Sequence, residues 1–252
     1  MALLHERPPV LLAVFAHPDD ETFRCGGMLA LLARRGVQVN VISATRGEAG
    51  SCGEPQLCCA EELAEIRERE LQCACNILGI RPPTFLGYSD GKLDEVDEEE
   101  AIARIKAFTH ELHPQILLTW PADGLSDHPD HKAVSRWTSL VFEEMANEAE
   151  APIALYHLAV PQSVADELNL NKLHAIPDEK VSLTVDVMTV WKQKRSAIRC
   201  HRTQGGGSPI LAAPEEKQRI FFGIEHFRQV CSREGDDWIL KMLSNPEIIK
   251  TH

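Results

Sequence analysis

The stretch VLLAVFAHPDDE at residues 10–21 decides the fold. Its first part, residues 10–16, is an uninterrupted apolar run, which is typical of a buried strand in a parallel sheet. A polar turn follows, and the apolar residues of 28–32 then have the spacing of an amphipathic helix that ends near Gly36. A second apolar run at 37–42 completes a strand–helix–strand unit, so the chain opens as an α/β protein.

The same alternation continues to about residue 150. The pattern predicts helices and strands in turn: a helix at 61–78, a strand at 84–86, a helix at 98–113, a strand at 115–120 and a helix at 131–145. In the first of these helices we expect Glu62, Arg67 and Glu70 on the solvent side. The alternation is typical of a doubly wound, Rossmann-like and mostly parallel sheet flanked by helices.

The regular alternation of strands and helices ends at about residue 151. We expect strands at 154–160 and 181–185, a helix at 187–199, a flexible loop at 205–207, a strand or turn at 221–231 and a helical tail. No repeat, low-complexity tract or linker interrupts the sequence. We therefore predict one domain over residues 1–252, with a core at about 8–150 and a C-terminal elaboration at about 151–252.

Composition narrows the class of protein. The chain carries 26 Lys and Arg against 38 Asp and Glu, a formal charge of −12, which disfavours nucleic acid and anionic lipid as main partners. The apolar run at 10–16 is far shorter than the roughly 20 residues that span a bilayer, and no export signal is recognisable. We predict a cytoplasmic protein.

The eight cysteines are then expected to be reduced thiols, buried or incidental. The cluster between Cys52 and Cys75 contains no Cys-x-x-Cys pair, so a structural zinc site there is the less favoured alternative.

Two polar turns carry the candidate chemistry. In the first, His17 and Asp20 are three residues apart, so both side chains can reach one metal ion, while Asp19 between them can contact its water. In the second, His128 and His131 follow the strand at 115–120 in the same spacing, with an acid between them. Helix capping and a solvated His-rich loop are the alternatives for the two turns.

Both turns follow predicted parallel strands, whose carboxyl ends meet at one edge of the sheet. His17, Asp20 and one further histidine would give three ligands and leave one position open for water, as in catalytic zinc sites. The first turn lacks Gly-x-Gly-x-x-Gly, so a nicotinamide dehydrogenase loses its main support.

The chain resembles the LmbE/PIG-L superfamily, zinc-dependent deacetylases of N-acetylglucosamine conjugates. The motifs AHPDDE at 16–21, TRGE at 45–48 and HPDH at 128–131 have the order and spacing of that family. The helix at 61–71, LGYSDG at 86–91 and HRTQ at 201–204 support the resemblance. It implies a Rossmann-like fold and a homo-oligomer, a trimer or hexamer.

The resemblance also implies roles for the residues of the two turns. His17, Asp20 and His131 would hold Zn²⁺, although the same ligands accept iron(II) or cobalt. Asp19 would be the general base, and His128 would assist at the carbonyl oxygen and the leaving amine.

Further roles follow for the surrounding residues. Asp130 would orient His128, Arg46 and Asp90 would grip the sugar, and His201 would lie at the rim of the active site. The alternatives are a surface ion pair for Arg46, a simple turn at Asp90 and a core or surface position for His201. The loop at 52–59 matches no pattern of the family.

The sequence thus predicts a metal-dependent hydrolase that removes the N-acetyl group from a small soluble N-acetylglucosaminyl conjugate, giving the glucosaminyl product and acetate. A thiol-conjugate amidase with the same metal site is the alternative enzyme. A non-catalytic metal-binding protein is disfavoured, because Asp19, His128 and all three expected ligands are present.

Overall fold

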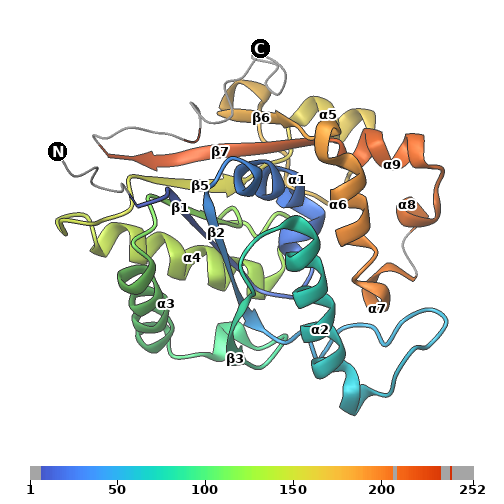
Figure 1. Ribbon diagram of the computed structural model, residues 1–252, viewed down its shortest axis with the longest axis horizontal. Coiled ribbons are helices and arrows are strands. Elements are labelled where there is room, and N and C mark those ends of the chain that lie inside the picture. Colours follow the sequence, from blue (N-terminus) through green and yellow to red (C-terminus); the bar gives the residue numbers. More distant parts are fainter. Residues whose placement is uncertain (1–6, 207–208, 234–238, 240–252) are drawn as a thin grey trace, which may run out of the picture.

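In the computed structural model, one sheet of seven strands runs through the described part of the chain, residues 7–206, 209–233 and 239 (Figure 1). Its strand order is β3-β2-β1-β4-β5-β7-β6. The first five strands are parallel, and β7 pairs antiparallel with both β5 and β6. The bounds are β1 Val10–Phe15, β2 Gln38–Thr45, β3 Thr84–Tyr88, β4 Ile116–Thr119, β5 Ala154–Leu158, β6 Leu183–Asp186 and β7 Ile224–Ser232.

Helices cover both faces of this sheet. On one face α1 (Asp20–Arg34), α2 (Ala60–Leu78) and α6 (Trp191–Ile198) pack against one another, and on the other α3 (Glu98–Leu112) packs against α4 (Pro129–Glu144). Figure 1 shows these two groups to the right and left of the strands. The shorter helices are α5 (Gln162–Glu167), α7 (Arg202–Gly205), α8 (Pro209–Ala212) and α9 (Glu215–Phe222), with 3-10 turns at Leu93–Glu95, Asp178–Lys180 and Met188–Val190.

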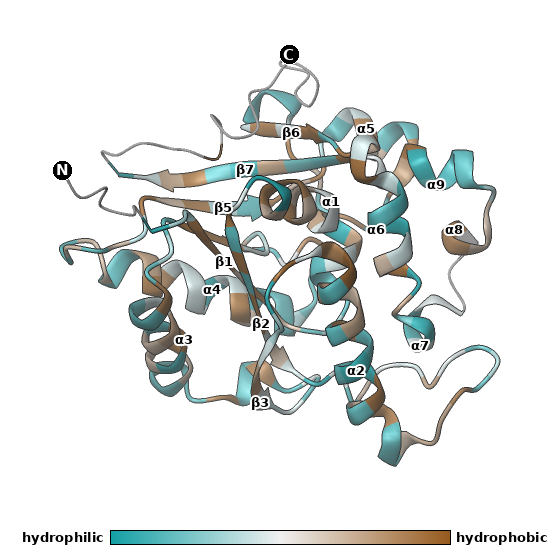
Figure 2. Cartoon of the chain, viewed as in Figure 1, coloured by the Kyte–Doolittle hydropathy of each residue, from teal (hydrophilic) through white to brown (hydrophobic). Residues whose placement is uncertain are grey.

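The strand β1 lies at the centre because it is apolar on both faces. All six of its residues are buried, and the five from Leu11 to Phe15 alternate between the two hydrophobic clusters that the flanking helices complete. In Figure 2 this strand is brown along its length, whereas the helices also carry teal faces. Since β2 and β4 lie on either side of β1, the chain reverses its winding direction there, and a crevice opens at the carboxyl ends of these strands.

The structure confirms the α/β fold class and the expected mostly parallel sheet. The segment expected as a strand or turn at 221–231 forms β7, and the helix expected at 187–199 begins with a 3-10 turn before α6. Gly205 ends α7 rather than lying in a loop, and α5 and α9 are helices that the sequence did not predict. Short helices of six and eight residues carry little periodicity. The expected helical tail lies outside the described residues.

The expectation of reduced thiols is wrong for one pair of cysteines. Cys73 on α2 and Cys200 after α6 form a disulfide across a sequence separation of 127 residues, with their Cα atoms 6.0 Å apart. The packing of α2 against α6 brings these two positions together, and no local pattern reveals it. The other six cysteines are free thiols.

Within the described residues, no helix combines the length and the apolar character that crossing a bilayer requires.

Candidate active site

The two polar turns and the loop after β3 meet at the carboxyl edge of the sheet. They surround a cavity of about 360 Å³, formed where β1, β3 and β4 end. Its walls are His17, Asp19, Asp20, Ala49, Gly50, Arg67, Asp90, Gly91, His128, His131 and Gln204. The structure therefore brings together His17, Asp20 and His131, the three expected ligands, with Asp19 and His128 beside them.

The three expected ligands have the spacing of a metal site. The distance from His17 Nδ1 to His131 Nε2 is 3.2 Å. Asp20 Oδ2 lies 3.7 Å from His17 Nδ1, and Asp20 Oδ1 lies 3.6 Å from His131 Nε2. Tetrahedral zinc with bonds of about 2.0–2.1 Å separates its ligand atoms by about 3.3 Å, so the two histidine nitrogens already have the separation that such an ion requires, with the Asp20 carboxylate beside them.

The second nitrogen of each histidine is held by an acceptor. His131 Nδ1 lies 3.1 Å from the carbonyl oxygen of Gly124, which can only accept, so this nitrogen carries the hydrogen and Nε2 keeps its lone pair. His17 Nε2 lies 3.0 Å from Asp90 and 3.1 Å from Asp130. Metal-ligating histidines are oriented in this way, because the outer partner fixes the tautomer and the ring plane.

The carboxylate of Asp20 is fixed on one side. Its Oδ2 accepts hydrogen bonds from the backbone nitrogens of Ala16 and His17 at 3.1 and 2.9 Å and from the indole of Trp120 at 3.2 Å. Burial raises the pKa of this carboxyl, but the neighbouring His131 and His17 outweigh it and lower the pKa. Asp20 is therefore ionised, with Oδ1 facing His131.

Two overlapping groups of donor atoms lie within 4.8 Å of one another in this cavity: His17, His128 and His131, and His17, Asp90 and Asp130. Burial alone would lower the pKa of His17, but the bonds to Asp130 and Asp90 raise it to about 10. In the second group the oxygens of Asp130 already accept from Gly91 N at 2.7 Å and Leu93 N at 3.1 Å. The structure thus shows a His/Asp cluster suited to a cation.

Asp19 is held in a backbone conformation that L-residues rarely adopt, with φ 120° and ψ −24°. Its carboxylate lies 3.3 Å from Arg67 Nη2 at the cavity wall. Burial raises the pKa of Asp19 to about 6, against the opposing effect of Arg67. A carboxylate whose pKa is close to neutral can both accept and return a proton, as a general base requires.

Arg67 is a site residue that the sequence did not predict, and its expected solvent position is wrong. Its side chain is 4% exposed, and its guanidinium donates to the carbonyl oxygens of Gly47 at 2.8 Å and Pro18 at 2.7 Å. A Cβ at Gly47 or Gly50 would overlap this guanidinium, so these glycines make room for it. The helical spacing from Leu63, four residues earlier, places Arg67 on the buried face and was the available signal.

The expected solvent position of Glu70 is also wrong. This residue is buried, and its carboxylate accepts from the backbone nitrogen of Thr203 at 2.9 Å and from the Thr203 hydroxyl at 2.7 Å. These bonds tie α2 to α7, and Gln204, the next residue, lines the cavity.

His128 lies at the cavity wall as the residue preceding α4. Its Nδ1 accepts from the backbone nitrogen of Asp130 at 3.2 Å, and its ring stacks on His131 with centroids 4.4 Å apart. Burial lowers the pKa of His128, and the neighbouring His131 and His17 lower it further. Asp130 contacts His128 through its backbone nitrogen, whereas its carboxylate contacts His17.

The three expected sugar contacts are placed differently from one another. Asp90 lines the cavity, where one oxygen contacts His17 and the other accepts from Ala49 N at 2.9 Å. Arg46 is not among the residues that form the wall, and its guanidinium pairs with Glu68 at 2.8 Å. The rim position expected for His201 is wrong, because its side chain is fully buried with Nε2 3.2 Å from the Thr22 hydroxyl.

A His/Asp cluster lies at the carboxyl edge of this α/β sheet, next to an aspartate whose pKa is close to neutral. Such an arrangement is typical of a metal-dependent hydrolase. The family model of PIG-L, GlcNAc-PI de-N-acetylase, matches residues 12–142. This segment contains both polar turns and just over half of the chain. The chain therefore belongs to the PIG-L family.

Individual proteins agree with this assignment. The chain is 31% identical to a 1D-myo-inositol 2-acetamido-2-deoxy-alpha-D-glucopyranoside deacetylase from Mycobacterium sp. (strain KMS), over 92% of this chain and 87% of the relative. It is also 31% identical to a probable N-acetyl-alpha-D-glucosaminyl L-malate deacetylase 2 from Bacillus cereus, over 77% and 83%. The structure of the N,N'-diacetylchitobiose deacetylase from Pyrococcus horikoshii has the same fold, with a TM-score of 0.65 and 23% identity over 88% of this chain and 83% of that one.

Proposed function

We propose that this protein is a metal-dependent deacetylase that hydrolyses the 2-acetamido group of a small N-acetylglucosaminyl conjugate, giving acetate and the free amine. The observation that carries the proposal is the cluster of His17, Asp20 and His131 with Asp19 beside it, in one cavity at the carboxyl edge of the sheet. The names of the two relatives of 31% identity, both deacetylases of amino-sugar compounds, support the reaction type.

We assign the metal to His17, Asp20 and His131, and propose Zn²⁺ as the ion, with iron(II) or cobalt suited to the same donors. When bound there, the ion would polarise the amide carbonyl and lower the pKa of water to about 7. Asp90 and Asp130 hold His17 from its other side, so they act as positioning residues in this proposal.

Proton transfer is the proposed task of Asp19. Its carboxylate takes a proton from the attacking water as the C–O bond forms, and returns it to the amine nitrogen as the C–N bond breaks. The strained backbone at Asp19 and the contact with Arg67 keep this carboxylate at the cavity wall.

His128 is proposed to stabilise the negative charge that develops on the carbonyl oxygen. Since its Nδ1 accepts from the backbone of Asp130, Nε2 carries the hydrogen and is the nitrogen that can donate to the substrate. Losing one such donor typically costs about 3 kcal/mol of transition-state stabilisation, or on the order of 10²–10³ in rate.

The proposed substrate is a soluble conjugate rather than a polymer or a lipid. A net charge of −12 gives no bulk attraction to anionic surfaces, and the acetyl group is small, so recognition has to come from the sugar. We retain Arg46 and Asp90 as proposed sugar contacts, although Arg46 would first have to leave Glu68. A homo-oligomer likewise remains a prediction, which light scattering tests.

The test is acetate and free-amine release from a panel of N-acetylglucosaminyl glycosides by protein loaded with zinc, iron(II) or cobalt. Metal-free protein and the His131→Ala variant are the controls, and both are expected to be inactive. A thiol-conjugate amide in the same panel tests the alternative amidase. Cleavage of that amide with no acetate release from any sugar would replace the proposed reaction with the amidase reaction.

A further inference from the structure

A buried histidine that the proposed reaction does not use directly precedes α7. The side chain of this residue, His201, is fully buried. Its Nε2 lies 3.2 Å from the hydroxyl of Thr22 and 3.5 Å from Oε1 of Glu21, and both of these residues belong to the first turn of α1. Since Glu21 and Thr22 are also fully buried, the three side chains form one enclosed polar cluster beside the turn that carries Asp19.

The hydrogen bonds of this cluster have a defined direction. The Thr22 hydroxyl donates its one hydrogen to Glu21 Oε1, so its oxygen accepts from His201 Nε2 and the hydrogen of the imidazole is on that nitrogen. The other oxygen of Glu21 accepts from the backbone nitrogen of Asp19 at 3.2 Å. A chain of hydrogen bonds therefore runs from His201 through Thr22 and Glu21 to the backbone of Asp19.

This chain ends at the most unusual backbone conformation of the site. Five of the described residues other than glycine have a positive φ, and in four of them it lies between 49° and 66°, in the left-handed helical region. In the fifth, Asp19, φ is 120°, a conformation that persists only where the surroundings hold it. The bond to Glu21 holds the N–H of Asp19, and the ion pair with Arg67 at 3.3 Å holds its carboxylate.

His201 has an anchor of its own outside α1. Two residues further along the chain, the backbone nitrogen and the hydroxyl of Thr203 donate to the buried carboxylate of Glu70 at 2.9 and 2.7 Å. Glu70 lies on α2, three residues after Arg67, which pairs with Asp19. The segment that carries His201 is therefore joined to both supports of Asp19, the first turn of α1 and the helix α2.

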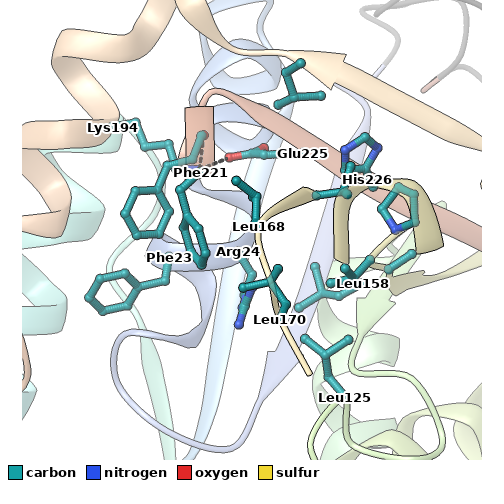
Figure 3. Close-up of a pocket in the computed structure, with 16 residues that line it drawn as sticks. Phe23, Arg24, Leu125, Leu158, Leu168, Leu170, Lys194, Phe221, Glu225 and His226 are labelled. Atoms are coloured by element: carbon teal, nitrogen blue, oxygen red, sulfur yellow. Dashed lines mark hydrogen bonds and ion pairs between the residues drawn. The ribbon is translucent and has the colours of Figure 1, made fainter. Parts of the chain in front are cut away.

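Phe23 covers the cluster on the side of a small neighbouring cavity. Its ring centroid lies 6.1 Å from that of His201 and 6.0 Å from that of Phe222. Figure 3 shows Phe23 at the wall of this cavity of about 50 Å³, whose mostly apolar walls include Leu168 and Leu170. In such surroundings a hydrogen bond is stronger than at the surface, and the loss of one partner is more costly.

We propose that Thr22 and His201 are positioning residues for the general base. Through Glu21 they hold the backbone of Asp19 in its rare conformation, so that the carboxylate stays at the cavity wall where the proton is transferred. Both side chains are fully buried, so they act through Asp19 rather than on the substrate. The inference rests on the proposed deacetylase function and gives the buried His201 a place in it.

The experiment removes the Thr22 hydroxyl with the nearly isosteric Thr22→Val. We expect kcat of the metal-loaded protein to fall by about 10- to 100-fold, since a small displacement of a catalytic group has a cost of this order. KM and the metal content should stay those of the natural protein, because the hydroxyl is directed at Glu21 and His201 rather than at the cavity. Thr22→Ser keeps the hydroxyl and should restore kcat almost completely.

Thr109→Val is the matched control for the loss of a buried hydroxyl. Thr109 is fully buried on α3, and its hydroxyl donates to the carbonyl oxygen of Ile105 at 3.0 Å. This variant should lose thermal stability to a similar extent while its kcat stays unchanged. His201→Leu removes the donor to Thr22 and should lower kcat as Thr22→Val does. The double variant should lose no more than the weaker of the two single variants retains, because both changes break the same chain of hydrogen bonds.

Hydrogen exchange of the Asp19 amide, followed by NMR, is a second readout that does not need turnover. Exchange should be faster in Thr22→Val than in Thr109→Val, because only the first change loosens the acceptor of this amide. Faster exchange supports the inference even if no acetate is released from any substrate, an outcome that would overturn only the proposed reaction.

Three results would overturn the positioning role and leave the deacetylase proposal standing. The first is acetate release by Thr22→Val with the kcat of the natural protein or with a change in KM alone. The second is an equal loss of kcat in Thr22→Val and Thr22→Ser, because the hydroxyl would then not be the cause. The third is an Asp19 amide that exchanges at the same rate in Thr22→Val and Thr109→Val.

Discussion

Replacing Arg67 with methionine tests whether this buried guanidinium organises the active site. The change keeps a stem of similar length but removes the bonds to the carbonyl oxygens of Gly47 and Pro18 and the ion pair with Asp19. At the lower end of about 1.5 kcal/mol for each charge-assisted bond, the two carbonyl bonds alone contribute about 3 kcal/mol. For a chain of this length that corresponds to a fall in melting temperature of roughly 6–12 °C.

The same variant should lose activity beyond its loss of stability. Arg67 joins the turn after β1 to the loop after β2, so without it the carboxylate of Asp19 is no longer held against the cavity. A displacement of 1 Å from the productive geometry costs on the order of 10²-fold in rate, and we expect a fall of that size in kcat/KM at temperatures where the variant is folded. Arg67→Lys should not rescue it, because one ammonium lacks the fork that reaches both carbonyl oxygens.

The assays are thermal unfolding and kcat/KM for acetate release by the metal-loaded protein. Arg69→Met is the matched control on the same helix, because Arg69 is exposed and its bond is to the Glu65 carbonyl oxygen one turn earlier. This control should behave as the natural protein in both assays. Wild-type kcat/KM together with a melting temperature within 1 °C for Arg67→Met would refute the positioning role.

Four further outcomes are expected. His131→Ala should lower the metal content measured by atomic absorption and abolish acetate release, whereas full activity without metal would contradict the proposed ligand set. Asp19→Asn should keep the metal and lose about 10²- to 10⁴-fold in kcat, and equal turnover would rule out Asp19 as the base. Lys194→Met should cost about 3–5 kcal/mol in urea unfolding because it strands a buried carboxylate, while the exposed Lys192→Met should change little. Burial lowers the pKa of His157 to about 4, so between this value and 6.5 the unfolded chain binds more protons than the folded one, and the free energy of unfolding decreases as the pH is lowered. The loss is about 2 kcal/mol at pH 5 relative to neutral pH, and His157→Gln should remove that part of the pH dependence in urea unfolding.

The sequence predicted the elements whose periodicity is strong. The apolar run at 10–16, the helix at 61–78 and the alternation up to residue 150 correspond to β1, α2 and the parallel sheet of the structure. It also predicted that the two His-Pro-Asp turns meet, because each follows a parallel strand and such strands end at one edge. The short α5 and α9 were not predicted, since a helix of about two turns has too little pattern to recognise.

By itself, then, the sequence determined the class of fold and the edge of the sheet where chemistry is placed, because strand and helix periods are local properties of the chain. Only the tertiary structure decided which polar side chains face that edge. Arg67 lines the cavity and Arg46 does not, the carboxylate of Asp130 contacts His17, and Cys73 is bonded to Cys200. These contacts join segments far apart along the chain, and they depend on how the helices pack on the sheet; a local pattern can indicate which face of a helix is buried but not which residues that face will meet.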